Sequence, residues 1–399
     1  MSRIVVTGLG VVSSVGQNSE DFWASIVGGR HNFTEAVAHP GYSFRVGAVP
    51  GEWTPGELPL RSLSFCDRSG LFALCAAREA LAKAGFGARS FATPERVAVV
   101  LGNGGGGLQS IQEQYERLFV EHNPRVHPFT IIRAMCSSSA SLISLAFGTK
   151  GPCFVTSSAC ASATQAIGLA AQLIRSGVAD VAITGGAEAP LARGTLLAWH
   201  AMKIVSHDIC RPFSRNRDGL TISEGAGILV LESEAHARAR GVSPKIGIAG
   251  FASNSDSGDI IAPTEEGMAR AMRDALRDAG LGPHDIDYIN AHGTGTRAND
   301  ATEAKAVKTV FGADAKIAMS STKGTTGHAL GAAGALEAIA TILAMENGTA
   351  PPTANFQESD PDCDLDVLPN EARPMQIGAA LSNSFAFGGL NATLVFEQL

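Results

Sequence analysis

Strand-like apolar runs alternate with helix-forming segments along this chain, and the alternation begins a second time near residue 245. In the first part, for example, the apolar runs at 3–15 and 96–101 each lead through glycines into a helix-forming segment. Such alternation favours mainly parallel sheets with helices on both faces. We therefore predict an α/β fold made of two related halves, residues 1–240 and 241–399.

Two similar predicted helices, one in each half, support this duplication. The segments 161–175 and 334–347 are both predicted to be helices, both carry an Ala-Ile pair, and both end near a glycine. One pair of similar helices is a weak repeat, so it supports the two halves without establishing them.

Composition disfavours several functional classes. Hydrophobic residues make up 45% of the 399 residues and charged residues 17%, which suits a large buried core and argues against disorder. The net charge of −7 argues against sequence-independent nucleic-acid binding. No uncharged apolar run is long enough to predict a membrane span. The seven cysteines include no C-x-x-C pair, so we expect a cytoplasmic protein without disulfides or a structural zinc site.

Cys160 has the setting of a reactive thiol. It follows a short β-prone run, 154–156, and a Ser-Ser-Ala turn, and it immediately precedes the predicted helix 161–175. Unpaired backbone N–H groups and the dipole at a helix start favour a thiolate. We predict that Cys160 is a nucleophile and interpret the other six cysteines as structural.

Three further segments place polar or aromatic residues after predicted strands. His292 lies in the Asn-Ala-His-Gly-Thr-Gly-Thr segment 290–296, and Lys323 and His328 lie in 320–328. The third is the Asn-Ser-Phe-Ala-Phe-Gly-Gly segment that begins at Asn383. Because functional residues of parallel α/β folds gather at the carboxyl ends of strands, we expect these segments to meet near Cys160.

The four motifs resemble those of the β-ketoacyl-acyl-carrier-protein synthases, decarboxylating ketosynthases of the thiolase superfamily, and the resemblance covers essentially the whole chain. It implies a thiolase-like duplicated fold in α-β-α-β-α layers with mainly mixed five-stranded sheets. It also implies that an acyl chain passes from acyl carrier protein to Cys160 and condenses with malonyl carrier, with loss of carbon dioxide. The pathway would be fatty-acid or type II polyketide biosynthesis, with neither cofactor nor metal.

The resemblance implies a role for each motif residue. His292 and His328 would donate hydrogen bonds to the enolate, and we expect His328 to matter more for decarboxylation than for acyl loading. Lys323 would pair with Glu337. The other implied roles are an oxyanion hole from the backbone N–H groups of Cys160 and Phe387, phosphopantetheine binding by Thr294 and Thr296, and an acyl-pocket gate and wall at Phe385, Phe387 and Gly105.

The chain departs from the family pattern at a few positions. Ala386 and Leu390 replace the glycine and threonine that are usual in the closing motif, and we expect the alanine to stiffen that loop. Gly105 stands where relatives often carry a bulky residue, which predicts a longer or differently shaped acyl channel. The segment 351–367 resembles nodulation-E-type members.

The resemblance also implies partners. The family is dimeric, so we expect a homodimer or a heterodimer with a ketosynthase-like subunit. An acidic acyl carrier protein needs a basic dock, for which the candidates are Arg61, Arg68, Arg125 and Arg133.

The sequence disfavours three alternative functions. A non-catalytic chain-length-factor subunit typically lacks the nucleophile, whereas Cys160 and both histidines are present. A thiolase would carry a second cysteine in the closing motif, which has none. The glycine run 102–107 fits a dinucleotide-binding expression with Glu121 at the acidic spacing, but no clear strand precedes Glu121, so we interpret this match as coincidental.

Overall fold

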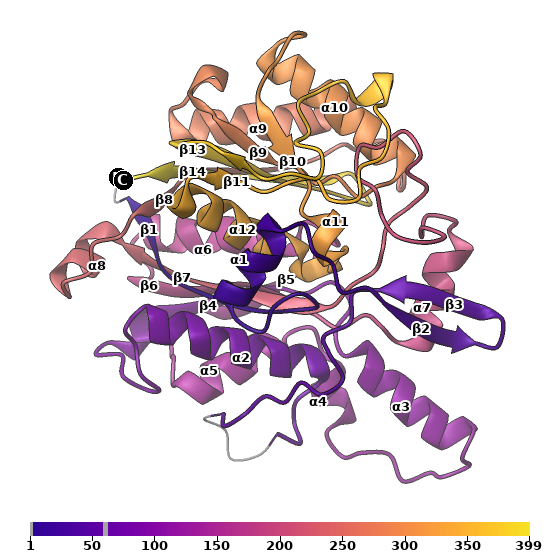
Figure 1. Ribbon diagram of the computed structural model, residues 1–399. Helices are drawn as coiled ribbons and strands as arrows, with labels where there is room; N and C mark the ends of the chain where they lie inside the picture. Colours follow the sequence, from indigo (N-terminus) through magenta and orange to yellow (C-terminus); the bar gives the residue numbers. More distant parts are fainter. Residues whose placement is uncertain (1–2, 59–62) are drawn as a thin grey trace.

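The computed structural model describes residues 3–58 and 63–399, in which three helical layers alternate with two layers of strands (Figure 1). The central layer holds α6 (Ser162–Arg175) and α12 (Ala333–Asn347). The main outer helices are α2 (Arg68–Lys83) and α5 (Ser138–Phe147) on one side, and α9 (Glu265–Ala279) and α10 (Arg297–Phe311) on the other. The predicted layered α/β fold is confirmed.

Each half contributes five strands to the main sheet, and the two groups share one topology. They are β1 (Ile4–Ser13), β4 (Val97–Gly102), β5 (Cys153–Thr156), β6 (Val181–Glu188) and β7 (Gly225–Ser233), then β8 (Ile246–Ser255), β9 (Tyr288–Asn290), β10 (Ala318–Ser320), β13 (Ala379–Ala386) and β14 (Leu390–Gln398). In both groups the order across the sheet is third, second, fourth, fifth, first strand in chain order. The parallel and antiparallel pairings also correspond, so the duplication extends to the whole topology.

The two groups of strands join where β1 pairs with β8. Ile4 pairs with Ile248, and Val5 with Gly247, so these ten strands form one mixed sheet where five-stranded sheets were expected. Both strands lie at an edge of their own group, and pairing satisfies backbone groups that an open edge would leave unpaired. The boundary between residues 240 and 241 stays a prediction.

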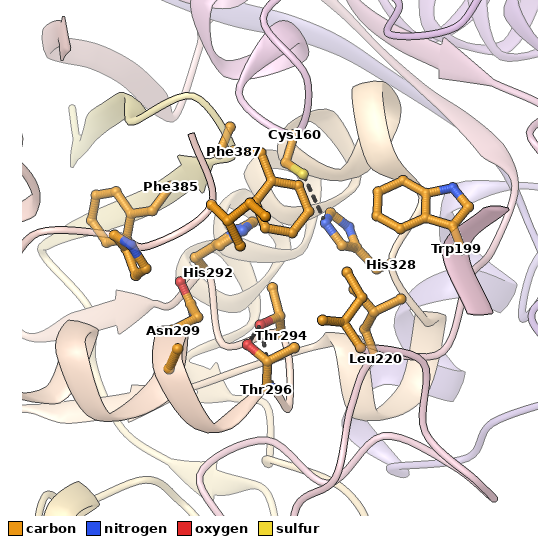
Figure 2. A pocket seen from close by; sticks show the side chains of 15 residues that line it. Cys160, Trp199, Leu220, His292, Thr294, Thr296, Asn299, His328, Phe385 and Phe387 are labelled. Carbon is orange, nitrogen blue, oxygen red and sulfur yellow. Dashed lines mark hydrogen bonds between the residues drawn. The ribbon is translucent and has the colours of Figure 1, made fainter. Parts of the chain in front are cut away.

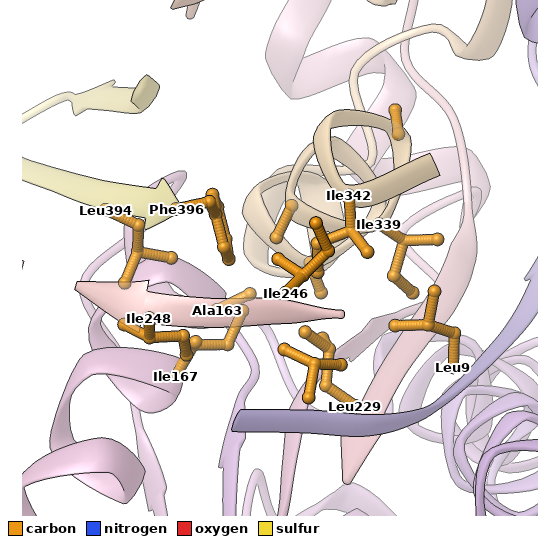
Figure 3. Packing of buried hydrophobic residues seen from close by; sticks show 14 of the residues in the cluster. Leu9, Ala163, Ile167, Leu229, Ile246, Ile248, Ile339, Ile342, Leu394 and Phe396 are labelled. Atoms are coloured by element: carbon orange, nitrogen blue, oxygen red, sulfur yellow. The ribbon is translucent and has the colours of Figure 1, made fainter. Parts of the chain in front are cut away.

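The central helices are rich in small residues because they are covered by strands on two sides and by each other. Alanines at positions such as 166, 170, 335 and 338 are fully buried, and larger side chains including Ile167 and Ile339 fill the space toward the strands (Figure 3). The two helices approach closely at Gly334, where a Cβ atom would lie 2.0 Å from Oγ1 of Thr164. A helix that is apolar on every face, like α12, belongs in such an interior.

The outer helices are amphipathic and have sequence-encoded ends. Asp67 caps α2 by accepting a hydrogen bond from the backbone of Ser69, and Thr264 caps α9 through Gly267. At the other end of α9, Gly280 adopts a left-handed conformation with φ +69°, which glycine tolerates without strain. The sequence pattern predicts helices over 67–85 and 266–280, and the observed ends agree with these bounds to within two residues.

Several elements differ from the predictions. The small-residue segment 127–148 predicts one helix, but it forms α4 (Thr130–Ala134) and α5, because Met135 is extended between them. The Pro- and Gly-rich segment 30–65 contains a hairpin of β2 (Thr34–His39) and β3 (Tyr42–Val46), which was not predicted. The helix α7 (Arg193–Ala201) was also missed.

The remaining elements are short or peripheral. They are α1 (Ser19–Val27), α3 (Leu108–Phe119), α8 (Glu234–Ala239), α11 (Lys323–Thr326), β11 (Thr349–Ala350) and β12 (Arg373–Pro374), with 3-10 turns at Pro94–Arg96, Pro283–Asp285, Leu330–Ala332 and Pro361–Cys363. Within the described ranges, no helix combines the length and the apolarity needed to cross a bilayer.

Candidate active site

Cys160 lies in a tight turn between β5 and α6. Ala159, just before it, has φ +48°, a left-handed conformation that is uncommon for alanine and that indicates a constrained backbone. Ser162 holds the turn, since its Oγ accepts from the backbone N–H of Ser158 at 2.9 Å and donates to the carbonyl of Ala159 at 2.7 Å. The turn therefore presents the Cys160 side chain at the carboxyl end of β5, as the sequence predicted.

His328 is the direct partner of this thiol. Its Nε2 lies 3.0 Å from Sγ of Cys160, and this contact is drawn in Figure 2. The backbone of His328 is fixed by hydrogen bonds to Thr221 at 2.7 Å and from Ser223 at 3.0 Å. The main chain that carries the ring is thus anchored at both its N–H and its carbonyl group.

The resting thiol is neutral. Burial raises the pKa of the Cys160 thiol to about 12, and the charge of Lys323 lowers it only in part. Burial therefore opposes the thiolate that the helix start favours. Attack by sulfur then requires a proton acceptor at the thiol, a place that Nε2 of His328 occupies.

His292 lies next to His328 and is anchored by Lys323. The two imidazole rings meet edge to face, with centroids 5.4 Å apart. Nζ of Lys323 donates to the carbonyl of His292 at 2.5 Å and lies 3.4 Å from its Nδ1. The same ammonium forms an ion pair with Glu337, and both side chains are almost fully buried.

These contacts define the protonation of His292. An ammonium group can only donate, so Nδ1 of His292 accepts and the ring proton resides on Nε2. Burial, with the charge of Lys323, holds the pKa values of His292 and His328 well below the usual range. Both rings are therefore neutral near pH 7, and His292 offers Nε2–H as a hydrogen-bond donor.

Two buried carboxylates support the loop that carries His292, and the sequence analysis missed both. Glu303 accepts hydrogen bonds from the backbone N–H groups of His292 and Gly293, each at 2.8 Å. Asp300, one turn earlier on α10, accepts from Gly295 at 3.2 Å. Their spacing of three on one helix face was the available signal, but acidic residues on a helix are far more often solvated. Burial raises the pKa of Glu303 to about 7.

A first cavity of about 100 Å³ leads to Cys160, and Figure 2 shows the side chains around it. Thr294 and Thr296 line it, with their hydroxyl oxygens 2.9 Å apart. Phe385 and Phe387 line it as well. The predicted threonine and phenylalanine positions thus converge on one cavity with the thiol and both histidines.

A second cavity of about 220 Å³ also reaches Cys160, and Gly105 lines it. Phe387 and Trp199 line both cavities, and their rings are stacked with centroids 6.1 Å apart. Phe387 therefore stands between the cavities, whereas Phe385 lines only the first. Trp199, on the unpredicted helix α7, was missed because no local motif marks it.

The loop that carries Phe387 is tied to the loop after β8. The backbone N–H of Gly388 donates to the carbonyl of Ile260 at 2.8 Å, and that of Asp256 donates to Gly389 at 2.9 Å. Gly388 and Gly389 have φ +80° and +66°, which explains the glycine pair. Ile261 lines the first cavity, so movement of either loop changes the approach to Cys160.

The three predicted docking arginines that lie within the described residues line neither cavity. Arg61 lies outside the described residues. Arg68 pairs with Glu224 at 2.7 Å, Arg133 approaches Glu113 at 3.8 Å, and Arg125 is exposed. Their docking role stays a prediction.

The reactive atoms themselves are close together. One donor atom each from Cys160, His292 and His328 lies within 4.8 Å of the others, a spacing that a metal ion could also use. The expected absence of a metal therefore stays a prediction.

The chain matches two adjacent family models. Residues 1–237 match the model described as "Beta-ketoacyl synthase, N-terminal domain", and residues 246–357 match "Beta-ketoacyl synthase, C-terminal domain". Together the matches include Cys160, His292, Lys323, His328 and Glu337.

Curated relatives and solved structures agree over the full length. Nodulation protein E of Rhizobium sp. (strain N33) is 42% identical over 400 residues, covering 100% of this chain and 99% of the relative. The 3-oxoacyl-[acyl-carrier-protein] synthase 2 of Coxiella burnetii is 38% identical over 409 residues, with coverages of 100% and 99%. The solved structure described as "The ishigamide ketosynthase/chain length factor" has a TM-score of 0.94 and 35% identity, covering 100% of this chain and 99% of that one.

Proposed function

Because the chain belongs to the β-ketoacyl synthase family, we propose that it joins an acyl group held on Cys160 to a malonyl unit delivered by acyl carrier protein, with loss of carbon dioxide. One observation carries the assignment of the nucleophile, the 3.0 Å contact between Sγ of Cys160 and Nε2 of His328. The direct test is the intact mass of the protein after incubation with a panel of acyl carriers. Absence of an acyl adduct with every carrier would refute the proposal.

Acyl loading begins with proton transfer from the neutral thiol of Cys160 to Nε2 of His328. The thiolate sulfur attacks the thioester carbon, and when the tetrahedral intermediate collapses the carrier sulfur leaves and takes the proton back from His328. Backbone N–H groups of Cys160 and Phe387 are proposed to hold the oxyanion. The position of Phe387 on the boundary of both cavities supports this role.

Condensation is proposed to begin with a hydrogen bond from His292. When the malonyl thioester loses carbon dioxide, negative charge develops on its thioester oxygen, and Nε2–H of His292 is oriented to stabilise it. The carbanion then attacks the acyl thioester on Cys160, and the sulfur leaves as thiolate. Lys323 and Glu337 hold His292 and are proposed to act through it, not on substrate.

The carrier arm is proposed to occupy the first cavity and the acyl chain the second. Hydroxyl groups of Thr294 and Thr296 suit the amides of phosphopantetheine, and the lining of the second cavity near Gly105 and Leu108 suits an alkyl chain. None of these steps needs a resident cofactor. We propose that the protein works in the cytoplasm, in fatty-acid or type II polyketide biosynthesis.

The partner is a second ketosynthase-type subunit, identical or different. A solved relative described as a ketosynthase/chain length factor supports the heterodimer as one option. The alternative in which this chain is itself the non-catalytic subunit is not favoured, since the thiol and its histidine partner are intact. A thiolase is not favoured either, because the loop 385–389 holds no cysteine.

Carrier docking is proposed at two exposed cations beside the first cavity. Lys203 adjoins the lining residue Ile204, and Arg297 adjoins Ala298. Lys203→Glu is expected to raise the KM for acyl carrier by roughly fivefold at low salt, since rim charges steer an acidic partner. The rate at which iodoacetamide alkylates Cys160 should stay unchanged.

Lys150→Glu is the matched control for docking. Lys150 precedes β5 whereas Cys160 follows it, so the control charge lies at the opposite end of that strand. Equal effects of the two variants on KM would contradict a dock at Lys203.

Gly105→Ile is expected to shorten the accepted acyl chain. A Cβ at Gly105 would lie 2.7 Å from Cδ1 of Leu108, so a larger side chain must occupy the second cavity. Palmitoyl loading should fall by about tenfold while butyryl loading stays nearly constant, because only the longer chain needs that space. Equal loss of both, measured by intact mass over time, would place the acyl chain elsewhere.

A further inference from the structure

Glu188 is a fully buried carboxylate that the proposed chemistry does not use. It is the last residue of β6, and its Oε2 accepts hydrogen bonds from the backbone N–H groups of Gly104 at 2.6 Å and Gly331 at 3.2 Å. Its Oε1 accepts from Gly105 at 3.1 Å. One side chain thus connects two loops that are distant in the sequence.

The glycines at these positions make room for the carboxylate. A Cβ atom would lie 2.4 Å from Oε2 at Gly331 and 3.0 Å from Oε2 at Gly104. Successive backbone N–H groups that converge on an anion form a nest, and here the anion belongs to the protein itself. The glycine run, which superficially matches a nucleotide-binding motif, therefore binds an internal carboxylate.

Both connected loops form the wall of the second cavity. Gly104, Gly105 and Leu330 line it together with Glu188 and Cys160. Leu330 has φ +46°, a conformation that leucine adopts only when its surroundings impose it, and the hydrogen bond from the next residue to Glu188 is one such constraint. The carboxylate thus bridges opposite segments of the cavity wall, one following β4 and one following His328.

On the basis of the proposed function, we propose that Glu188 is a positioning residue for acyl-chain selection. By holding Gly104, Gly105 and Gly331 it fixes the wall against which a long acyl chain packs. A short acyl group on Cys160 makes fewer contacts with this wall and depends on it less.

The ionisation of Glu188 bears on this role. Burial raises its pKa to about 7, against the lowering effect of the three backbone N–H donors and with a smaller raising effect from Asp67. The other titratable neighbours are the thiols of Cys136 and Cys160, whose pKa values the Glu188 charge raises. Protonation turns one acceptor oxygen into a donor, so the hold on the loops weakens as pH falls through about 7.

The test compares Glu188→Gln with Glu303→Gln. Both change a buried carboxylate that accepts backbone N–H groups, but Glu303 holds the loop of His292. Glu188→Gln leaves one N–H group facing the amide nitrogen, so palmitoyl loading of Cys160 should fall about tenfold relative to butyryl loading. Glu303→Gln should lower malonyl decarboxylation and leave this palmitoyl-to-butyryl ratio unchanged. Glu188→Asp, which keeps the charge, should recover part of the ratio.

A pH series on the unmodified protein tests the same idea without a variant. The palmitoyl-to-butyryl loading ratio should fall as the pH is lowered from 8 to 6, because this range spans the pKa of about 7 of Glu188. Taking a ratio cancels the effects of Cys160 and Glu303 on loading in general. In Glu188→Gln the ratio should be low and independent of pH.

The outcomes separate this proposal from the proposed function. If no acyl carrier loads Cys160 in the unmodified protein, the proposed function fails. If loading proceeds normally but the ratio is the same in Glu188→Gln, or does not change with pH, only the role of Glu188 is overturned. A ratio that falls equally in Glu303→Gln would also overturn it, since any buried carboxylate would then have the same effect.

Discussion

Replacing Cys160 by alanine should abolish acyl transfer, with a loss of roughly 10⁴-fold or more in condensation rate. The reason is geometric. The reactive group that follows β5 in the tight turn is this thiol, and Nε2 of His328 lies 3.0 Å from it. The variant should show no mass increase after incubation with any acyl carrier.

Cys75→Ala is the matched control for this experiment. Cys75 is also buried, but its Sγ donates to the carbonyl of Pro55 at 3.5 Å and lies in the outer helix α2. The control should retain acylation and condensation. An acyl adduct on the Cys160→Ala protein would disprove the nucleophile assignment directly.

Alanine substitutions of the two histidines should impair different steps of the reaction. His292→Ala should lower malonyl decarboxylation by roughly 10²–10³-fold and leave acyl loading within a few-fold, because its Nε2–H only donates to the enolate. His328→Ala should lower both steps, loading by about 10²-fold, because the thiol loses its proton acceptor. This revises the expectation from the sequence that His328 serves mainly decarboxylation.

Separate assays distinguish these outcomes. Decarboxylation is measured as carbon dioxide released from malonyl carrier, and loading as the time course of intact mass with acyl carrier. Normal loading in His328→Ala would mean that the 3.0 Å contact has no role in proton transfer. Equal loss of loading in both variants would contradict the separate roles.

The sequence was informative about elements whose pattern is local. The α2 and α9 helices have apolar spacing and capping residues of their own, and their ends were predicted closely. The hairpin β2–β3 and helix α7 were missed because they depend on tertiary contacts, such as those of His200 on α7 with Tyr42 and Phe44 of the hairpin. Met135, extended in the structure, carries no signal that would break a predicted helix.

The site was predictable where a motif marks a residue, and not where burial or backbone contacts create the role. Cys160, His292, Lys323 and His328 follow strands, and they meet as expected from that placement. Glu188 and Glu303 act on backbone N–H groups, which every residue possesses, so no pattern of residue types reveals them. The raised pKa of Cys160 follows from burial, which the sequence alone could not quantify.

The matching strand orders of the two halves have a consequence for how such a site can change. Cys160 follows β5 and precedes α6, while His328 follows β10 and precedes α12, so the thiol and its partner occupy equivalent places in two copies of one unit. Neither copy alone contains both the thiol and the histidine, so a protein truncated to either half would lack the pair. The two loops can nevertheless change independently in sequence, because each is carried by its own copy of the strand-and-helix unit. The repeated topology thus provides two equivalent positions, one for the group proposed to carry the acyl chain and one for the group proposed to accept its proton.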